Sequence, residues 1–440
     1  MRPSLARVII LVMTSLGLTG GHALAAPMAD RDDQALKAFR FDRIDADVKT
    51  LPPGPQRDYF AGMAANAEGR LEDSVKLLTD ALPALRASRP DRAAQALDTL
   101  ADNYTKLFRY ADAEASYQDL QAHFSSQLSP TELKGAKNDG QLSHVLSGAP
   151  AQTITFDGPV DIKTVRNPLG SLNADLTVNA VTGPWLLDTG ANMSVITESF
   201  AKKLGLTPLS GVAQTQAGMT GIENPMHVAI IPTLPIGGAT VHNVVALVLP
   251  DDNLKVQYDK AGNRYQINAI IGYPVFQALG RVTFRRDGEV LAGDAASPSV
   301  GGARMYMKAL APIIFCKVAG QDLPFSFDTG AFSTDLLLAY YERFKAQAPK
   351  WKRVDSLSSG AGGVVKQKVY VQETVTFQAG DRSVVLHHVT IHSTGTGSDN
   401  DDLYGNLGED FVAGFDSFTL DFTAMRLSLG RPLAPEPTKP

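Results

Sequence analysis

The tetrapeptide Asp-Thr-Gly-Ala occurs twice in the 440-residue sequence, at 188–191 and 328–331. Each copy follows an apolar, strand-like run, Trp185-Leu186-Leu187 before the first and Phe325-Ser326-Phe327 before the second. A carboxylate at the end of a buried strand is costly to desolvate, and a glycine two residues later permits a sharp turn. Two such carboxylates, 140 residues apart (328 − 188), predict a duplicated unit that brings both to one site.

Three further features follow each tetrapeptide in the same order, which indicates an internal repeat. They are a glycine-rich segment, an apolar step that ends in glycine, and an alternating strand. The first copy has Gly218-Met219-Thr220-Gly221, Ile270-Ile271-Gly272 and Val282-Thr283-Phe284, and the second has Gly360-Ala361-Gly362-Gly363, Asn406-Leu407-Gly408 and Phe418-Thr419-Leu420. The glycine-rich segments begin 30 (218 − 188) and 32 (360 − 328) residues after their aspartates.

With these motifs, residues 152–432 resemble the aspartic proteases, and more closely their retropepsin-like branch. The resemblance implies an all-β acid-protease domain of closed β-barrel type, with lobe 1 at 152–295 and lobe 2 at 302–432. It also implies a role for each motif residue. The catalytic dyad would be Asp188 and Asp328, its support Thr189, Gly190, Thr329 and Gly330, and the substrate-binding flaps Gly218, Met219, Thr220 and Gly221 with Gly360, Ala361, Gly362 and Gly363.

Two carboxylates at hydrogen-bonding separation share one proton, so one can activate water while the other donates. The resemblance therefore implies an aspartic endopeptidase that hydrolyses a peptide or protein substrate without metal, cofactor or covalent intermediate. Because one chain holds both aspartates, a monomer suffices. The alternative is a catalytically inactive protein that binds peptides, or a scaffold that uses its N-terminal helices.

Two departures from the family pattern affect the expected site. Ala191 and Ala331 stand where pepsin-like lobes usually have Ser or Thr. A missing hydroxyl donor at both aspartates predicts a higher pKa for the pair and a less acidic working pH. Asn406 stands where an aliphatic residue is usual, which bears on the packing of lobe 2.

The first 25 residues have the pattern of a signal peptide. Arg2 and Arg7 precede an apolar stretch from Val8 to Leu18, and Ala23-Leu24-Ala25 provides a small-residue cleavage site. The apolar stretch is too short to span a bilayer, and no later stretch replaces it. We expect an exported protein, periplasmic or secreted, without a membrane span.

Residues 28–145 are rich in Ala, Leu, Asp and Arg and predict an all-α region. Two segments align at an offset of 39 (110 − 71), with Leu71 on Tyr110, Ser74 on Ala113 and Leu78 on Tyr117. This pattern favours either a degenerate tetratricopeptide-like repeat or a plain helical bundle. Either could dock a protein partner or stabilise the chain, and neither contains catalytic residues.

The remaining composition excludes several classes of site. The net charge is −5 with no basic block, which argues against nucleic acid as a partner. His387, His388 and His392 have no acidic partner at ligand spacing in sequence, so we expect solvated strand histidines and no metal. The tail 433–440 is rich in proline and is expected to be disordered.

Overall fold

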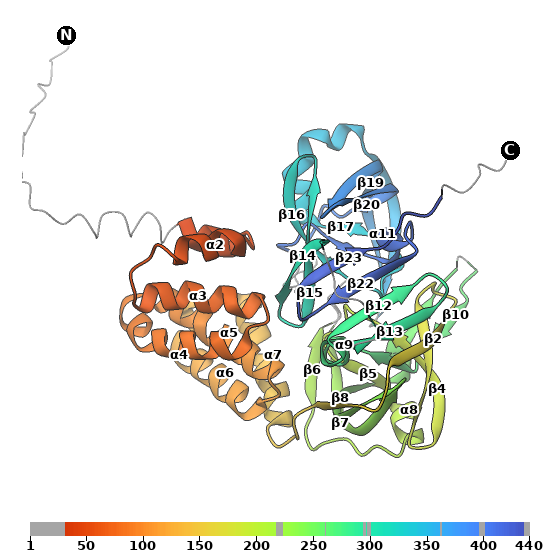
Figure 1. Ribbon diagram of the computed structural model, residues 1–440, viewed down its shortest axis with the longest axis horizontal. Coiled ribbons are helices and arrows are strands. Elements are labelled where there is room, and N and C mark those ends of the chain that lie inside the picture. The colour runs from red at the N-terminus through yellow and green to blue at the C-terminus, as the bar shows by residue number, and fades with distance from the viewer. Residues whose placement is uncertain are drawn as a thin grey trace, which may run out of the picture.

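The computed structural model describes residues 31–216, 223–259, 261–293, 296, 301–360, 363–395 and 401–434. Helices form the first part of this chain and strands dominate from residue 153 on (Figure 1). The predicted fold class, an all-α region followed by a two-lobed all-β domain with a closed barrel, is confirmed. The predicted signal peptide lies outside the described residues, as does the tail from 435 on. No helix in the described ranges has the length and apolarity needed to cross a membrane.

The helical region is a stack of consecutive helices. A helical segment over residues 31–37 comes first. It is followed by α2 (Phe41–Val48), α3 (Pro55–Ala67), α4 (Leu71–Ser88), α5 (Pro90–Lys106), α6 (Tyr110–Phe124) and α7 (Pro130–Leu146). Helix α7 begins with a capping box, in which the Ser129 side chain accepts from the Glu132 N–H and Glu132 accepts from the Ser129 N–H.

The aligned segments of the sequence occupy equivalent places in this stack. Leu71 and Tyr110 begin α4 and α6, and Ser74 and Ala113 are fully buried one turn later. The preceding helices end in the same turn, with a left-handed residue at Gly69 and Phe108. In each turn the next residue, an arginine, donates its N–H to the carbonyl five residues before it.

A third copy of this turn occurs at Phe39, before α2, and the sequence analysis missed it. Its offset from the second copy is 30 (69 − 39), not 39, because the first helices are shorter. Over the described residues the stack therefore has three helix pairs followed by α7, and three is the number of repeats that such arrays usually need for stability. Its tetratricopeptide-like character stays a prediction.

The two lobes repeat the same order of elements. Lobe 1 has β1 (Thr153–Phe156), β2 (Val160–Arg166), β3 (Leu172–Val178), β4 (Val181–Leu187), β5 (Ser194–Thr197), α8 (Glu198–Lys203), β6 (Ala213–Gln216), β7 (Glu223–Ile236), β8 (Ala239–Leu249), β9 (Lys255–Gln257), β10 (Arg264–Gln266), β11 (Ala269–Ile271), α9 (Tyr273–Leu279), β12 (Arg281–Arg285) and β13 (Glu289–Ala292). Lobe 2 has β14 (Ala303–Lys308), β15 (Ala311–Val318), β16 (Gln321–Phe327), β17 (Asp335–Leu336), α10 (Leu338–Phe344), β18 (Lys352–Gly360), β19 (Gly363–Ala379), β20 (Arg382–Ile391), β21 (Gly405–Leu407), α11 (Glu409–Val412), β22 (Ser417–Asp421) and β23 (Arg426–Leu429). Strands β15 to β17 thus correspond to β3 to β5, and β20 to β23 correspond to β8 and β11 to β13.

A six-stranded antiparallel sheet joins the lobes, in the order β2-β13-β12-β22-β23-β14. At its centre β12 pairs with its own counterpart β22, and the equivalent residues Thr283 and Thr419 face each other with hydroxyls 2.8 Å apart. Beside them the rings of Phe284 and Phe418 stack at 4.7 Å. The local two-fold relation between the lobes therefore passes through this strand pair.

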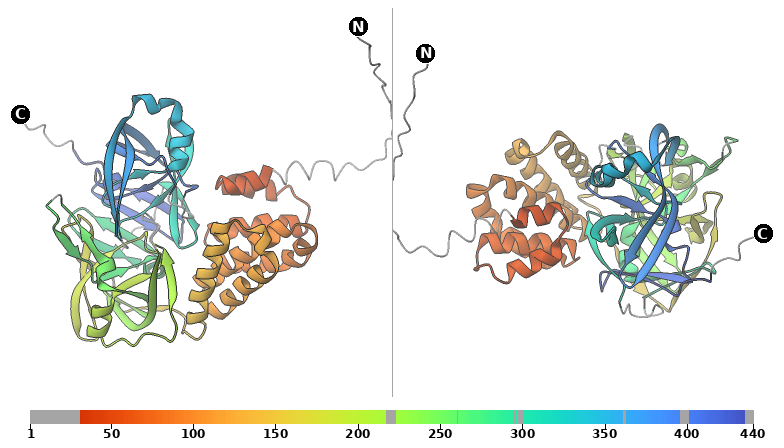
Figure 2. Two further views of the ribbon diagram at one scale, coloured as in Figure 1. Left: turned by 180° about the vertical axis from the view of Figure 1, so that it is seen from behind. Right: turned by 90° about the horizontal axis from the view of Figure 1, so that it is seen from above.

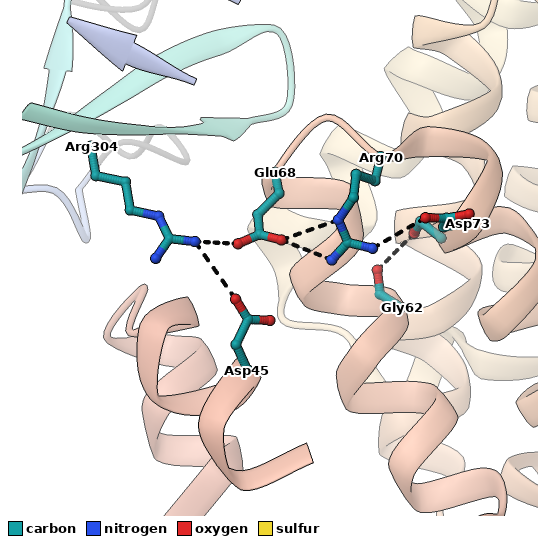
Figure 3. A network of polar contacts seen from close by, with 7 residues as sticks. Asp45, Gly62, Glu68, Arg70, Asp73 and Arg304 are labelled. Atoms are coloured by element: carbon teal, nitrogen blue, oxygen red, sulfur yellow. Dashed lines mark hydrogen bonds and ion pairs between the residues drawn. The ribbon is translucent and has the colours of Figure 1, made fainter. Parts of the chain in front are cut away.

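The helical stack packs against both lobes (Figures 1 and 2). Its three turns supply much of the contact. Phe39 lies under the Lys308 ammonium at 5.3 Å, Gly69 lies beside Met425, and Phe108 lines a small cavity with Leu310. Arg304 of β14 reaches Glu68 and, at 3.6 Å, Asp45, and Glu68 also pairs with Arg70 (Figure 3).

Candidate active site

Each aspartate is delivered to the lobe boundary by a tight hairpin. Strands β3 and β4 are joined by Asn179 and Ala180, and β15 and β16 by Ala319 and Gly320, all with positive φ. Such two-residue turns match the twist of the flanking strands and fix their register. Strands β4 and β16 then run parallel to β11 and β21, whose last residues accept the aspartate N–H groups, at 3.1 Å for Asp188 and 2.9 Å for Asp328.

The two threonines cross the lobe boundary. The Thr189 N–H donates to Thr329 Oγ1 at 3.0 Å, and the Thr329 N–H donates to Thr189 Oγ1 at 3.1 Å. Each hydroxyl donates in turn to a carbonyl of the opposite lobe, Thr189 to Phe327 at 3.3 Å and Thr329 to Leu187 at 2.9 Å. Both threonines are buried, so these four bonds fix the two turns against each other without competition from water.

Gly190 and Gly330 each lie in close contact with the carboxyl group of the aspartate from the opposite lobe. A Cβ atom added at Gly190 would lie 2.7 Å from Oδ1 of Asp328, and one added at Gly330 would lie 2.7 Å from Oδ1 of Asp188. Side chains do not tolerate contacts this short with a group that is itself fixed. Each lobe therefore leaves out a side chain so that the other lobe's aspartate fits.

The carboxyl groups receive matched backbone donors. Oδ1 of Asp188 accepts from the N–H groups of Gly190 at 2.9 Å and Ala191 at 3.0 Å. Oδ1 of Asp328 accepts from Gly330 at 2.7 Å and Ala331 at 3.1 Å. Burial, followed by the charge of Asp328 and a hydrogen bond to it, raises the pKa of Asp188 well above its usual value, although its two N–H donors act in the opposite direction. Burial and the neighbouring carboxylate therefore both favour a protonated Asp188.

Asn406 breaks the symmetry of this arrangement. Its Nδ2 donates to Oδ2 of Asp328 at 3.1 Å, while its Oδ1 accepts from the Ser326 hydroxyl at 2.7 Å. The expectation that both aspartates lack a side-chain donor is therefore wrong for Asp328. The polar side chain at 406 is also accommodated by a second polar residue, Ser326, which the sequence analysis did not connect with it because 80 residues separate the two.

An ion pair lies next to Asp328. Glu409 is 5% exposed, and its Oε2 accepts from Arg166 of lobe 1 at 2.7 Å. Burial raises the pKa of Glu409, Arg166 lowers it, and the charge of Asp328 raises it further. In lobe 1 the equivalent position is Tyr273, whose N–H donates to Ala191 just as that of Glu409 donates to Ala331, both at 2.8 Å. The resemblance did not reveal Glu409, because it lies outside every shared motif.

The predicted flaps are only partly visible. Gly218, Met219, Thr220 and Gly221 lie outside the described residues, between the paired strands β6 and β7. Gly360 and Gly363 pair at the end of the β18–β19 hairpin, and Ala361 and Gly362 between them lie outside the described residues.

The histidines differ from one another. His387 and His388 are exposed, but His392 is 3% exposed, and its Nε2 lies 3.3 Å from Oδ1 of Asp335. The expectation of a solvated histidine is wrong for His392, because it follows β20 and points into lobe 2 beside β17. In the described part of the chain no group of three or more His, Cys, Asp or Glu side chains could hold a metal ion.

Residues 174–275, which contain the first Asp-Thr-Gly-Ala, match the family model described as aspartyl protease. This match confirms, over these residues, the resemblance to aspartyl proteases inferred from the sequence. Among solved structures the chain is similar to basic 7S globulin from soybean and to conglutin gamma, a basic 7S globulin from lupine seeds. Each has 10% identity and a TM-score of 0.40, with 62% of this chain and 94% of the other covered. A comparison with curated proteins gives no match.

Proposed function

We propose that the protein is an exported aspartic endopeptidase that hydrolyses peptide bonds with the Asp188–Asp328 dyad. One observation carries this proposal. Each lobe has a glycine, Gly190 or Gly330, at the position where any larger residue would collide with the carboxyl group of the opposite lobe's aspartate. A structural role for the two aspartates needs no such reciprocal fit. The family match over 174–275 supports the same reaction class.

In this mechanism the dyad binds one water and holds one proton. The ionised aspartate takes a proton from the water while the water oxygen bonds to the carbonyl carbon of the peptide. The protonated aspartate gives its proton to the carbonyl oxygen. The resulting diol collapses when the first aspartate passes its new proton to the amide nitrogen and the C–N bond breaks. A diol hydroxyl returns its proton to the second aspartate, so the dyad regains its starting state and no covalent intermediate forms.

The test is hydrolysis of an unfolded protein by purified enzyme, with and without a pepstatin-type inhibitor. We expect cleavage that the inhibitor blocks, and no cleavage by Asp188→Asn or Asp328→Asn, since each aspartate has half of the proton transfers. Asp381→Asn, in the exposed β19–β20 turn, is the matched control and should retain activity. Wild-type protein that binds the inhibitor but does not cleave would instead support the inactive peptide-binding alternative.

The proposal also includes export of the protein and activity as a monomer. Export is supported by the signal-peptide pattern of residues 1–25. Expression of the full chain in a bacterium, followed by fractionation and mass measurement of the mature N-terminus, tests it, and a chain that stays uncleaved in the cytoplasm would contradict it. Because both aspartates belong to one chain, the activity per mole of enzyme should not change with enzyme concentration in the range where sedimentation shows a monomer.

A further inference from the structure

The two halves of the dyad differ at one matched pair of positions. In lobe 1, Leu186 of β4 pairs with Ile270 of β11, and both are buried and apolar. In lobe 2, the corresponding partners on β16 and β21 are Ser326 and Asn406. The lobes thus exchange an apolar pair for a polar pair immediately behind the catalytic turn, while the backbone donors to the two carboxylates stay the same.

The polar pair is held in one orientation. The Ser326 hydroxyl donates to Oδ1 of Asn406 at 2.7 Å, and this leaves Nδ2 directed at Oδ2 of Asp328, 3.1 Å away. A flipped carboxamide would bring its oxygen against the Asp328 carboxylate, and the Ser326 hydroxyl would then have to donate to the Gly405 carbonyl, 3.3 Å away. Because Ser326 is 7% exposed, water does not readily replace it.

Donors and charges act on Asp328 in different directions. A hydrogen bond donated to a carboxylate favours its ionised form, and Asp328 receives three such bonds where Asp188 receives two. The ionisable groups around it, among the described residues, are Asp188 across the lobe boundary and Glu409 of α11. Glu409 disfavours a charge on Asp328 but is paired with Arg166 of β2, and Asp410 of α11 lies next to it.

We propose that Asn406, oriented by Ser326, is a positioning residue that keeps the proton of the dyad on Asp188 and leaves Asp328 as the base. Asp328 then takes the proton from water, and Asp188 gives its proton to the substrate carbonyl oxygen. The raised pKa of Asp188 agrees with this assignment. The inference rests on the proposed function and adds the direction of proton transfer to it.

The experiment compares pH profiles of kcat/KM for the wild type, Asn406→Leu and the double variant Ser326→Leu with Asn406→Ile. The double variant copies the lobe 1 pair into lobe 2, so its packing has a precedent in the same molecule. We expect the acid limb of the profile to move upward by about one pH unit in both, because the base loses a charge-assisted donor. Asn263→Leu is the matched control: its Nδ2 also donates to a carboxylate, Asp259 Oδ2 at 2.6 Å, but in the exposed β9–β10 hairpin, and the limb should stay in place.

A second readout does not need turnover. The pH dependence of thermal stabilisation by a pepstatin-type inhibitor should move in the same direction in both variants. A merely structural Asn406 would lower activity equally at all pH values and leave both limbs in place, and this result overturns the inference while the proposed function stands. A wild-type protein that neither cleaves nor binds the inhibitor overturns the proposed function and this inference with it.

Discussion

The residues of the site derive their properties from the opposite lobe. Thr189 and Thr329 form hydrogen bonds across the lobe boundary. The carboxyl groups of the opposite lobe fill the space that side chains at Gly190 and Gly330 would take. These positions could be identified from the sequence because the tetrapeptide repeats. The pairing of Ser326 with Asn406 could not, since it depends on the register of strands whose contact residues are 80 positions apart.

Replacing Thr189 by valine should destabilise the protein by about 1–3 kcal/mol, because the buried Thr329 N–H loses its acceptor and water cannot reach it. Valine keeps the shape of threonine, so packing changes little. Thr182→Val is the matched control, since the Thr182 hydroxyl bonds Thr177 on an exposed face. Urea unfolding of the two variants gives the difference, and equal free energies of unfolding would mean that the cross-lobe bonds add no stability.

Gly190→Ala should reduce kcat/KM by about 100-fold or more, because the new methyl group displaces the Asp328 carboxyl group from its position in the dyad. The melting temperature should change much less than the activity. Gly414→Ala serves as the control, because nothing lies within 4 Å of a Cβ atom there. Normal kinetics for Gly190→Ala would show that the dyad tolerates separation, against the reciprocal fit described above.

At the scale of elements, α7 joins the helical stack to lobe 1. It packs on β6, the first strand of the hairpin that carries the predicted flap, and Gln141 donates to the Val212 carbonyl at 2.8 Å. Val145 fits over Gly211, where an added Cβ would lie 2.9 Å from its Cγ2. The sequence predicted helices over 28–145 and a flap at 218–221, but not the contact of α7 with the strand before the flap, because helix-period apolar residues do not specify a partner.

Gly211→Ala should therefore destabilise the protein more than Gly205→Ala. Both glycines have positive φ, 112° and 70°, so both variants have backbone strain, but only Gly211 faces a neighbouring side chain. The additional destabilisation of Gly211→Ala, about 1 kcal/mol, should disappear when Val145 is also replaced by alanine. Chemical denaturation of the wild type, Gly211→Ala, Val145→Ala and the double variant gives the coupling free energy between the two positions. Additive free energies of unfolding would show that α7 does not press on this strand.

At the scale of the whole molecule, the helical stack is joined to the β lobes by a shared core. Tyr306, Ile313 and Leu403 of lobe 2 are buried together with helix residues, and the Tyr306 ring lies 4.9 Å from that of Phe41. From the sequence we expected either two copies of a degenerate tetratricopeptide-like repeat or a plain helical bundle. The described residues have three helix pairs, and the neighbouring structure is the chain's own two-lobed β domain. The docking surface could not be predicted, because it is formed by the turns between the helices and these vary in sequence.

This interface should respond to pH through Asp45. Burial, then Glu68, raises its pKa from 3.8 to about 6, so its ionisation destabilises the folded state progressively as pH rises through this window. The melting temperature of Asp45→Asn relative to wild type should therefore be more favourable at pH 7.5 than at pH 4.

Asp42, on the same helix, provides a control of opposite sign. Its hydrogen bond with Arg40 lowers its pKa, so its stabilising contribution is present at neutral pH and is lost as pH falls below 3.8. Asp42→Asn should be less stable than wild type at pH 7.5, and this difference should shrink in acid. Parallel pH trends for the two variants would contradict the electrostatic account of the interface.

The distance along the chain between the partners of the site has a consequence for biosynthesis. Asp188 is made early, but the groups that position it follow 140 residues later, and β12 finds its central partner only when residues 417–421 have been made. Until then Asp188 is an ordinary carboxylate without a second aspartate. A nascent or truncated chain therefore has no dyad, and the hydrolysis that we propose for the dyad can begin only after residues 417–421 have been made.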